Sequence, residues 1–193
     1  MRAVVRFLLP AAASLSLGAC FGGKPPPTLL TLTPSAAPVA IQRSAAAGQS
    51  VTIDVPLVAR EIRQVRVPVL ERPGEVTYVK GLQYTATPDQ LFQSLVSETV
   101  RRTTQRVVLE PGQTVLDPGL RVSGTLQRFG YDVASGQVIV TYDGILSTQG
   151  GTRVETRRFE ATAPADGTAA TVGPALNQAA NAVATQVAGW VGG

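Results

Sequence analysis

Regular alternation of apolar and polar residues begins at Val51. Val51, Ile53, Val55 and Leu57 are separated by single residues, which is the two-residue period of a strand with one buried face. Pro56 stands where the alternation would place a polar residue, and it has no amide hydrogen to donate. The pattern therefore predicts a strand over about 51–57 that lies at a sheet edge or contains a bulge at the proline.

Shorter strands are predicted on both sides of this segment. Residues 28–33 alternate weakly, and residues 34–49, rich in Ala, Ser and Pro, are typical of a loop. Val65, Val67 and Val69 repeat the alternation, residues 71–74 (Glu-Arg-Pro-Gly) form a turn signal, and a short strand is expected over 75–79.

The pattern changes to a helical period at Thr87. Thr87 is a suitable N-cap, Pro88 suits the first helical position, and Gln90 completes a capping box. The apolar residues that follow share one helical face: Leu91, Phe92, Leu95, Val96 and Val100. An amphipathic helix is predicted over about 87–105.

Three further strands are expected after a short apolar segment at 107–109. Alternation over 120–126 changes parity before Phe129, which predicts a bulge near Arg128. A second strand follows the Ser-Gly turn at 135–136, and residues 152–162 carry the charges of a protected edge strand. The three segments are predicted to form an antiparallel meander.

The last predicted element is a second helix over about 172–191. Its apolar side is Ala-rich: Leu176, Ala180, Val183, Val187 and Trp190. The order strands, helix, strands, helix predicts an α+β fold in a single domain, with an antiparallel sheet and both amphipathic helices packed on it.

The first residues indicate export. Arg2 and Arg6 precede an apolar run over 7–17 that is too short to span a bilayer, and small residues lead to a cleavage site between Ala19 and Cys20. Residues 17–20 (Leu-Gly-Ala-Cys) resemble a bacterial lipobox, in which the cysteine is acylated. The predicted organisation is a signal peptide over 1–19, a lipidated Pro- and Gly-rich tether over 20–27, and the folded domain over 28–193. An ordinary secretory signal that leaves a free cysteine is the alternative.

Composition removes most catalytic chemistry. The chain has no histidine and a single cysteine, which the lipobox uses, so Ser-His triads, thiol catalysis and His-bearing metal sites are excluded. No catalytic, cofactor-binding or metal-binding residue is predicted, no cofactor is expected, and only a carboxylate pair brought together from distant segments stays open. The formal net charge of +4, which falls to about +2 without Arg2 and Arg6, does not indicate a nucleic-acid partner.

Two features allow more than one interpretation. Arg60, Arg63 and Arg66 are expected on a solvated strand edge, and a contact with lipid headgroups or with a partner is the alternative. Trp190 and the Ala-rich helix face are expected in the core, and a docking face is the alternative.

Together these segments resemble the ABC-type transport auxiliary lipoproteins, which include the PqiC-like lipoproteins of MCE-type intermembrane lipid transport systems. The resemblance lies in the lipobox, in residues 51–55 (Val-Thr-Ile-Asp-Val) and 67–73 (Val-Pro-Val-Leu-Glu-Arg-Pro), and in the two helices, and it runs from about Thr28 to Trp190. The family often has Trp before Glu-Pro-Leu at the helix entry, where this chain has residues 87–91 (Thr-Pro-Asp-Gln-Leu).

The resemblance implies a non-catalytic protein, held by lipid on the periplasmic face of the outer membrane. Its implied partners are an MCE-type protein and ABC transporter subunits, and a homo-oligomer is left open. The alternative is a structural or assembly lipoprotein that supports another outer-membrane complex. A lipid-tethered enzyme is a third hypothesis, which the missing histidine disfavours.

Overall fold

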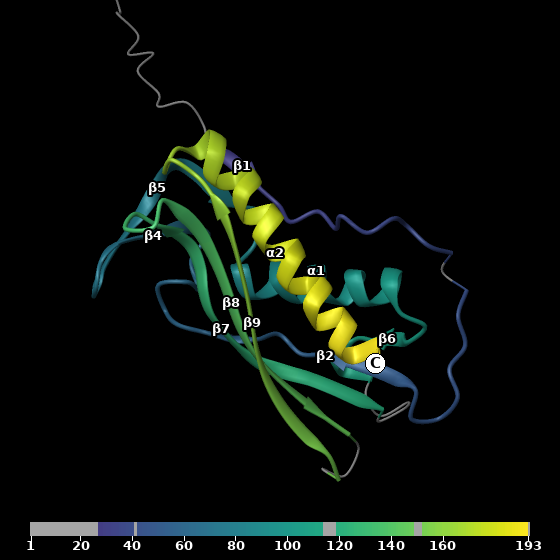
Figure 1. The fold of residues 1–193 in the computed structure, drawn as a ribbon. Coiled ribbons are helices and arrows are strands. Elements are labelled where there is room, and N and C mark those ends of the chain that lie inside the picture. The colour runs from purple at the N-terminus through teal and green to yellow at the C-terminus, as the bar shows by residue number, and fades with distance from the viewer. Residues whose placement is uncertain (1–26, 41, 114–118, 149–151, 193) are drawn as a thin grey trace, which may run out of the picture.

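Two helices lie across one face of a mixed β-sheet in the computed structural model (Figure 1). The structure describes residues 27–40, 42–113, 119–148 and 152–192. Ala19 and Cys20, with the predicted signal peptide and nearly all of the predicted tether, lie outside the described residues. The predicted α+β fold class is confirmed.

The elements follow the predicted order of strands, helix, strands and helix. They are β1 (Thr28–Leu30), β2 (Ser50–Ile53), β3 (Leu57–Val58), β4 (Arg66–Arg72), β5 (Glu75–Tyr84), α1 (Pro88–Thr103), β6 (Val107–Leu109), a 3-10 turn (Pro111–Gln113), β7 (Leu120–Asp132), β8 (Gln137–Ser147), β9 (Val154–Pro164) and α2 (Ala169–Gly192). No helix among the described residues is both long enough and apolar enough to cross a membrane.

The sheet is mixed, whereas the sequence predicted antiparallel pairing throughout. The predicted meander β7–β8–β9 is antiparallel, as is the hairpin β4–β5. In contrast β1 pairs with β5 in parallel, and β7 accepts β2, β3 and β4 as successive parallel neighbours along its other edge. Alternation identifies a strand and its buried face, but it contains no information on the direction of the neighbouring strand.

Two irregularities in the strands arise at predicted places. The register of β7 against β8 shifts between Leu126 and Arg128, which is the predicted bulge. The strand at Val51 stops at Ile53, and Val55 and Leu57 are 46% and 67% exposed, so the expected burial of these two residues is wrong. Pro56 divides the segment into two short strands.

Helix α1 confirms the predicted apolar face. Phe92, Leu95, Val96 and Val100 are buried, and Pro88 stands at the start of the helix. Thr87 is the N-cap residue, but its side chain makes no capping hydrogen bond, so the predicted capping box does not form.

The core lies between the helices and the sheet. Small residues on α2, including Ala180 and Ala184, are fully buried, and they let the helix approach both α1 and the sheet closely. A continuous row of rings crosses the core, with one ring from each helix and the others from the sheet: Tyr84, Phe129, Phe92, Tyr142, Phe159 and Trp190.

Candidate interaction surfaces

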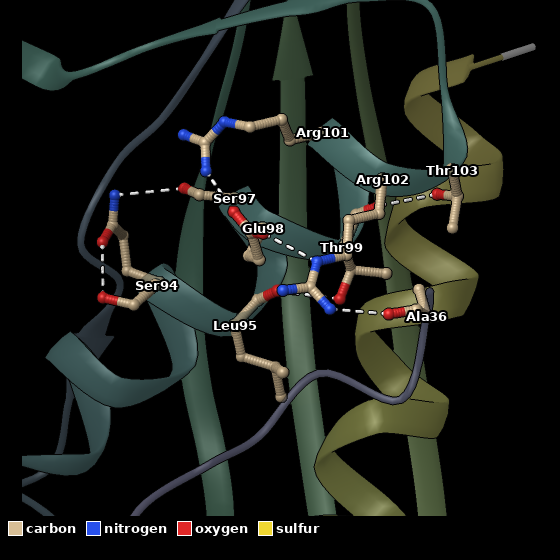
Figure 2. Close-up of polar contacts among 10 residues, drawn as sticks. Ala36, Ser94, Leu95, Ser97, Glu98, Thr99, Arg101, Arg102 and Thr103 are labelled. Carbon is tan, nitrogen blue, oxygen red and sulfur yellow. Dashed lines mark hydrogen bonds and ion pairs between the residues drawn. The ribbon is translucent and has the colours of Figure 1, made fainter. Parts of the chain in front are cut away.

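The charged groups on the exposed side of α1 are already paired with each other. Figure 2 shows Glu98 between Arg101 and Arg102, and Arg102 also donates to the backbone oxygen of Ala36 at 2.7 Å. Partial burial raises the pKa of Glu98, but the hydrogen bonds from the two arginines outweigh this effect, and the net pKa is lowered. The carboxylate is thus a structural clamp for the extended segment before β2, and it is not poised for proton transfer.

Other shifted pKa values also come from the fold, through hydrogen bonds in one case and through burial in two others. The hydroxyls of Thr171 and Thr168 lower the pKa of Asp166 from 3.8 to about 2, where the chain enters α2. Burial raises the pKa of Tyr84 and of Tyr142, so both phenols stay protonated. Among the described residues, no group of three or more His, Cys, Asp or Glu side chains is arranged to hold a metal ion.

The larger recess lies at the C-terminal ends of both helices. This helix-end cavity has a volume of about 660 Å³, and its lining combines polar side chains with apolar surface: Gln49, Thr103, Thr104, Gln105, Arg106, Thr185, Ala188, Gly189 and Gly192. Arg106 donates through Nε to the backbone oxygen of Val191 at 2.8 Å and thereby holds the two helix ends together. Amides, hydroxyls and one arginine beside apolar surface suit the binding of a protein segment that has both polar and apolar groups.

A smaller apolar recess lies on the face of the sheet that the helices leave uncovered, here called the open face. Residues of β4 explain it, because Val67 and Val69 face the core while Pro68 and Leu70 face outwards. Together with Ile62 and Val76 they line a groove of about 120 Å³. The motif at 67–73 thus supplies core and groove on alternate residues, and its end forms the β4–β5 turn, where Arg72 pairs with Glu75 at 2.9 Å.

The three arginines that were ambiguous in sequence lie beside this groove. Arg60 and Arg63 are exposed on the turn between β3 and β4, and Ile62 between them is buried. Arg66 begins β4, with its guanidinium carbon 3.9 Å from the centre of the Tyr78 ring. They are solvated, as predicted, but two of them belong to a turn.

Trp190 lies against the core, as the first interpretation predicted. Its ring centre is 5.4 Å from that of Phe159, and Nε1 donates to Oε2 of Glu155 at 3.1 Å. Sequence patterns did not identify Asn177 and Asn181 on α2, which bind the backbone of residues 33–35. The only signal was a pair of polar residues four apart on an apolar helix.

The fold and the surfaces first define a class: the described residues form one α+β domain with surface recesses, and most of its charged side chains are paired with one another. The family model for the ABC-type transport auxiliary lipoprotein component matches residues 30–188, and the chain belongs to that family.

Solved structures share the fold. Protein XCC0632 from Xanthomonas campestris, of the family DUF330, superposes with a TM-score of 0.73 at 20% sequence identity, over 86% of this chain and 94% of that chain. An uncharacterized protein superposes with a TM-score of 0.65 at 11% identity, over 86% of this chain and 99% of that one. No curated protein matches the sequence.

Proposed function

We propose that the protein is a non-catalytic auxiliary component of an ABC/MCE-type lipid transport system, lipidated at Cys20 and held on the periplasmic face of the outer membrane. The observation that carries this proposal is the match to the auxiliary lipoprotein family over residues 30–188. The lipobox at 17–20 and the paired state of most described charges support it, because lipid supplies attachment and the folded domain supplies contact surface.

The positions of the two ends support a role in bridging. Pro27 leads directly into β1, which lies near the start of α2, while the helix-end cavity lies at its other end (Figure 1). A helix of 24 residues is about 36 Å long. A partner bound at the cavity is therefore well separated from the tether, and we assign the MCE-type partner to the helix-end cavity.

Co-purification from native membranes tests both the function and the surface. Wild-type protein should carry MCE-type and ABC transporter subunits with it. A Cβ atom added at Gly189 would meet no atom within 4 Å, so Gly189→Glu should place a charged side chain in the cavity without disturbing the fold. We expect Gly189→Glu to reduce recovery of the MCE partner by about tenfold, because the added side chain should prevent one strong contact in the cavity.

Two controls complete the experiment. Gln178→Glu places the same charge on an exposed position of α2 outside the cavity lining, about three turns before Gly189, and should leave recovery unchanged. Cys20→Ser should release the protein from the membrane. Recovery of an unrelated outer-membrane complex in place of transporter subunits would refute the proposed function. Normal recovery with Gly189→Glu would refute only the assignment of the partner to the helix-end cavity.

A further inference from the structure

Cations without a carboxylate or carbonyl partner are unevenly distributed over the described residues. Most arginines are held: those on α1 by Glu98, Arg121 by Asp54, and Arg158 by Asp143. The side chains of Arg60, Arg63 and Lys80 have no such partner and are exposed, as is Arg157, which lies by itself on β9. Arg66 contacts only the ring of Tyr78.

The strand register brings these cations close to the point where the tether enters. Leu29 on β1 pairs with Gln83 on β5, which in turn pairs with Arg66 on β4. These three residues share the open face, and two strand spacings put the Cα atoms of Leu29 and Arg66 about 10 Å apart. Leu29 is a large apolar side chain that is 63% exposed.

Lys80 completes the set at the end of the sheet. Because β1 and β5 are parallel and Thr28 pairs with Leu82, Lys80 lies just beyond the start of β1. Arg60 and Arg63 belong to the turn that leads into Arg66, with Glu61 as the only acidic residue of that turn. Leu29, Arg60, Arg63, Arg66 and Lys80 form what we call the tether-side patch.

The length of the tether limits how far this patch can be from a membrane. Cys20 precedes Pro27 by seven residues, which reach about 25 Å when fully extended. A lipid on Cys20, as proposed above, keeps the start of β1 within that distance of the bilayer. Exposed cations attract an anionic lipid surface over about one Debye length, roughly 10 Å, and an exposed leucine can enter the interface.

We propose that the tether-side patch rests on the surface of the anionic bilayer that holds the lipid of Cys20. The domain then has a fixed orientation, with the open face at β1 towards lipid headgroups and the helix-end cavity away from them. This inference depends on the proposed lipidation of Cys20, and it goes further by naming the surface of the domain that faces the lipid. An acidic protein surface is the competing occupant, and the experiment distinguishes the two.

Lipid-quenched fluorescence on the full-length lipoprotein measures this orientation. Because the single native cysteine is at position 20, a second cysteine can be labelled selectively once Cys20 is acylated. Thr85→Cys places a fluorophore beside the patch, and Thr156→Cys places it on β9, exposed and far along the sheet. The proteins are reconstituted in phosphatidylcholine vesicles with or without phosphatidylglycerol, with a quencher attached to the lipid headgroups.

We expect quenching at position 85 to exceed that at position 156 by about threefold or more in vesicles with phosphatidylglycerol. Arg60→Glu combined with Arg63→Glu and Lys80→Glu should abolish this excess, and the neutral Gln substitutions should reduce it. High salt should act in the same direction. Equal quenching at both positions would overturn the inference. So would a higher quenching at position 85 that changes neither with lipid charge nor with the substitutions.

Flotation of the same vesicles separates the two proposals. If the wild-type protein does not float, acylation of Cys20 fails and the inference fails with it. If the protein floats and position 85 is no better quenched than position 156, only the orientation is refuted. If charge reversal removes transporter subunits from the co-purification and position 85 of the wild-type protein shows no excess quenching, the patch belongs to an acidic protein partner instead.

Discussion

At the residue scale, a glycine makes room for the only tryptophan. A Cβ atom at Gly144 would lie 3.2 Å from Cζ3 of Trp190, 3.2 Å from Phe159 and 3.0 Å from Tyr142. The three rings therefore pack on bare backbone of β8, and Glu155 accepts the indole hydrogen bond. An aromatic ring that covers a glycine in this way belongs to the core, although its edge reaches the surface.

Trp190→Ala should lower the free energy of unfolding by about 2–3 kcal/mol, somewhat less than for a fully buried ring. Trp190→Phe keeps the contact with Phe159 and should lose about 1 kcal/mol. Urea denaturation followed by far-ultraviolet circular dichroism measures both changes. Unchanged stability together with lost partner binding would instead support a docking role for Trp190.

At the element scale, α2 acts as a partner for an extended chain. Asn181 accepts from the amide of Ser35 at 2.7 Å and donates to the backbone oxygen of Thr33 at 2.9 Å. Asn177 accepts from the amide of Thr33 at 2.8 Å. Two asparagines four residues apart thus replace a neighbouring strand and fix the segment that follows β1.

Asn181→Ala should lower the free energy of unfolding by about 1–3 kcal/mol, because the backbone groups of Thr33 and Ser35 lose their partners. Asn177→Ala removes a single exposed bond and should cost less. Urea denaturation measures the difference, and hydrogen exchange at the Ser35 amide should become faster only with Asn181→Ala. Equal effects of the two substitutions would contradict this account.

At the scale of the whole molecule, one short contact joins the β4–β5 hairpin to the rest of the sheet. Strands β4 and β7 pair only at Val69 with Tyr131 and at Leu70 with Asp132. Next to this pairing a Cβ atom at Gly130 would lie 2.4 Å from the backbone oxygen of Pro68. The hairpin, and with it the open-face groove and Arg66, depends on a glycine at this junction.

Gly130→Ala should separate the two strands and lower the free energy of unfolding by about 1–3 kcal/mol, the usual cost of overpacking. Gly189→Ala is the matched control, since it lies in a helix with open space around it and should increase stability by about 0.5–1 kcal/mol. Denaturation gives both values. Faster hydrogen exchange confined to β4 and β5 is expected for Gly130→Ala. An equal increase in exchange across the whole sheet would contradict the role of Gly130 in joining the hairpin to β7.

Sequence patterns predicted the elements better than their partners. The stripe from Phe92 to Val100 located α1, and the parity change before Phe129 located the bulge. The capping hydrogen bond of Thr87 was expected from its position but does not form, because a cap depends on a side-chain rotamer as well as on spacing. The helix-end cavity had no sequence signal, since its lining comes from residues near 49, 105 and 189.

By itself, the sequence determined the class of the fold, the face that each long element buries and the exclusion of histidine chemistry, because local periodicity and residue type act over short distances along the chain. Only the tertiary structure decided that β7 takes parallel neighbours and that an extended segment docks on Asn181. It also gathered Leu29, Arg66 and Lys80 at one end of the sheet. Contacts between distant segments depend on which surfaces pack together, and no local pattern encodes that choice.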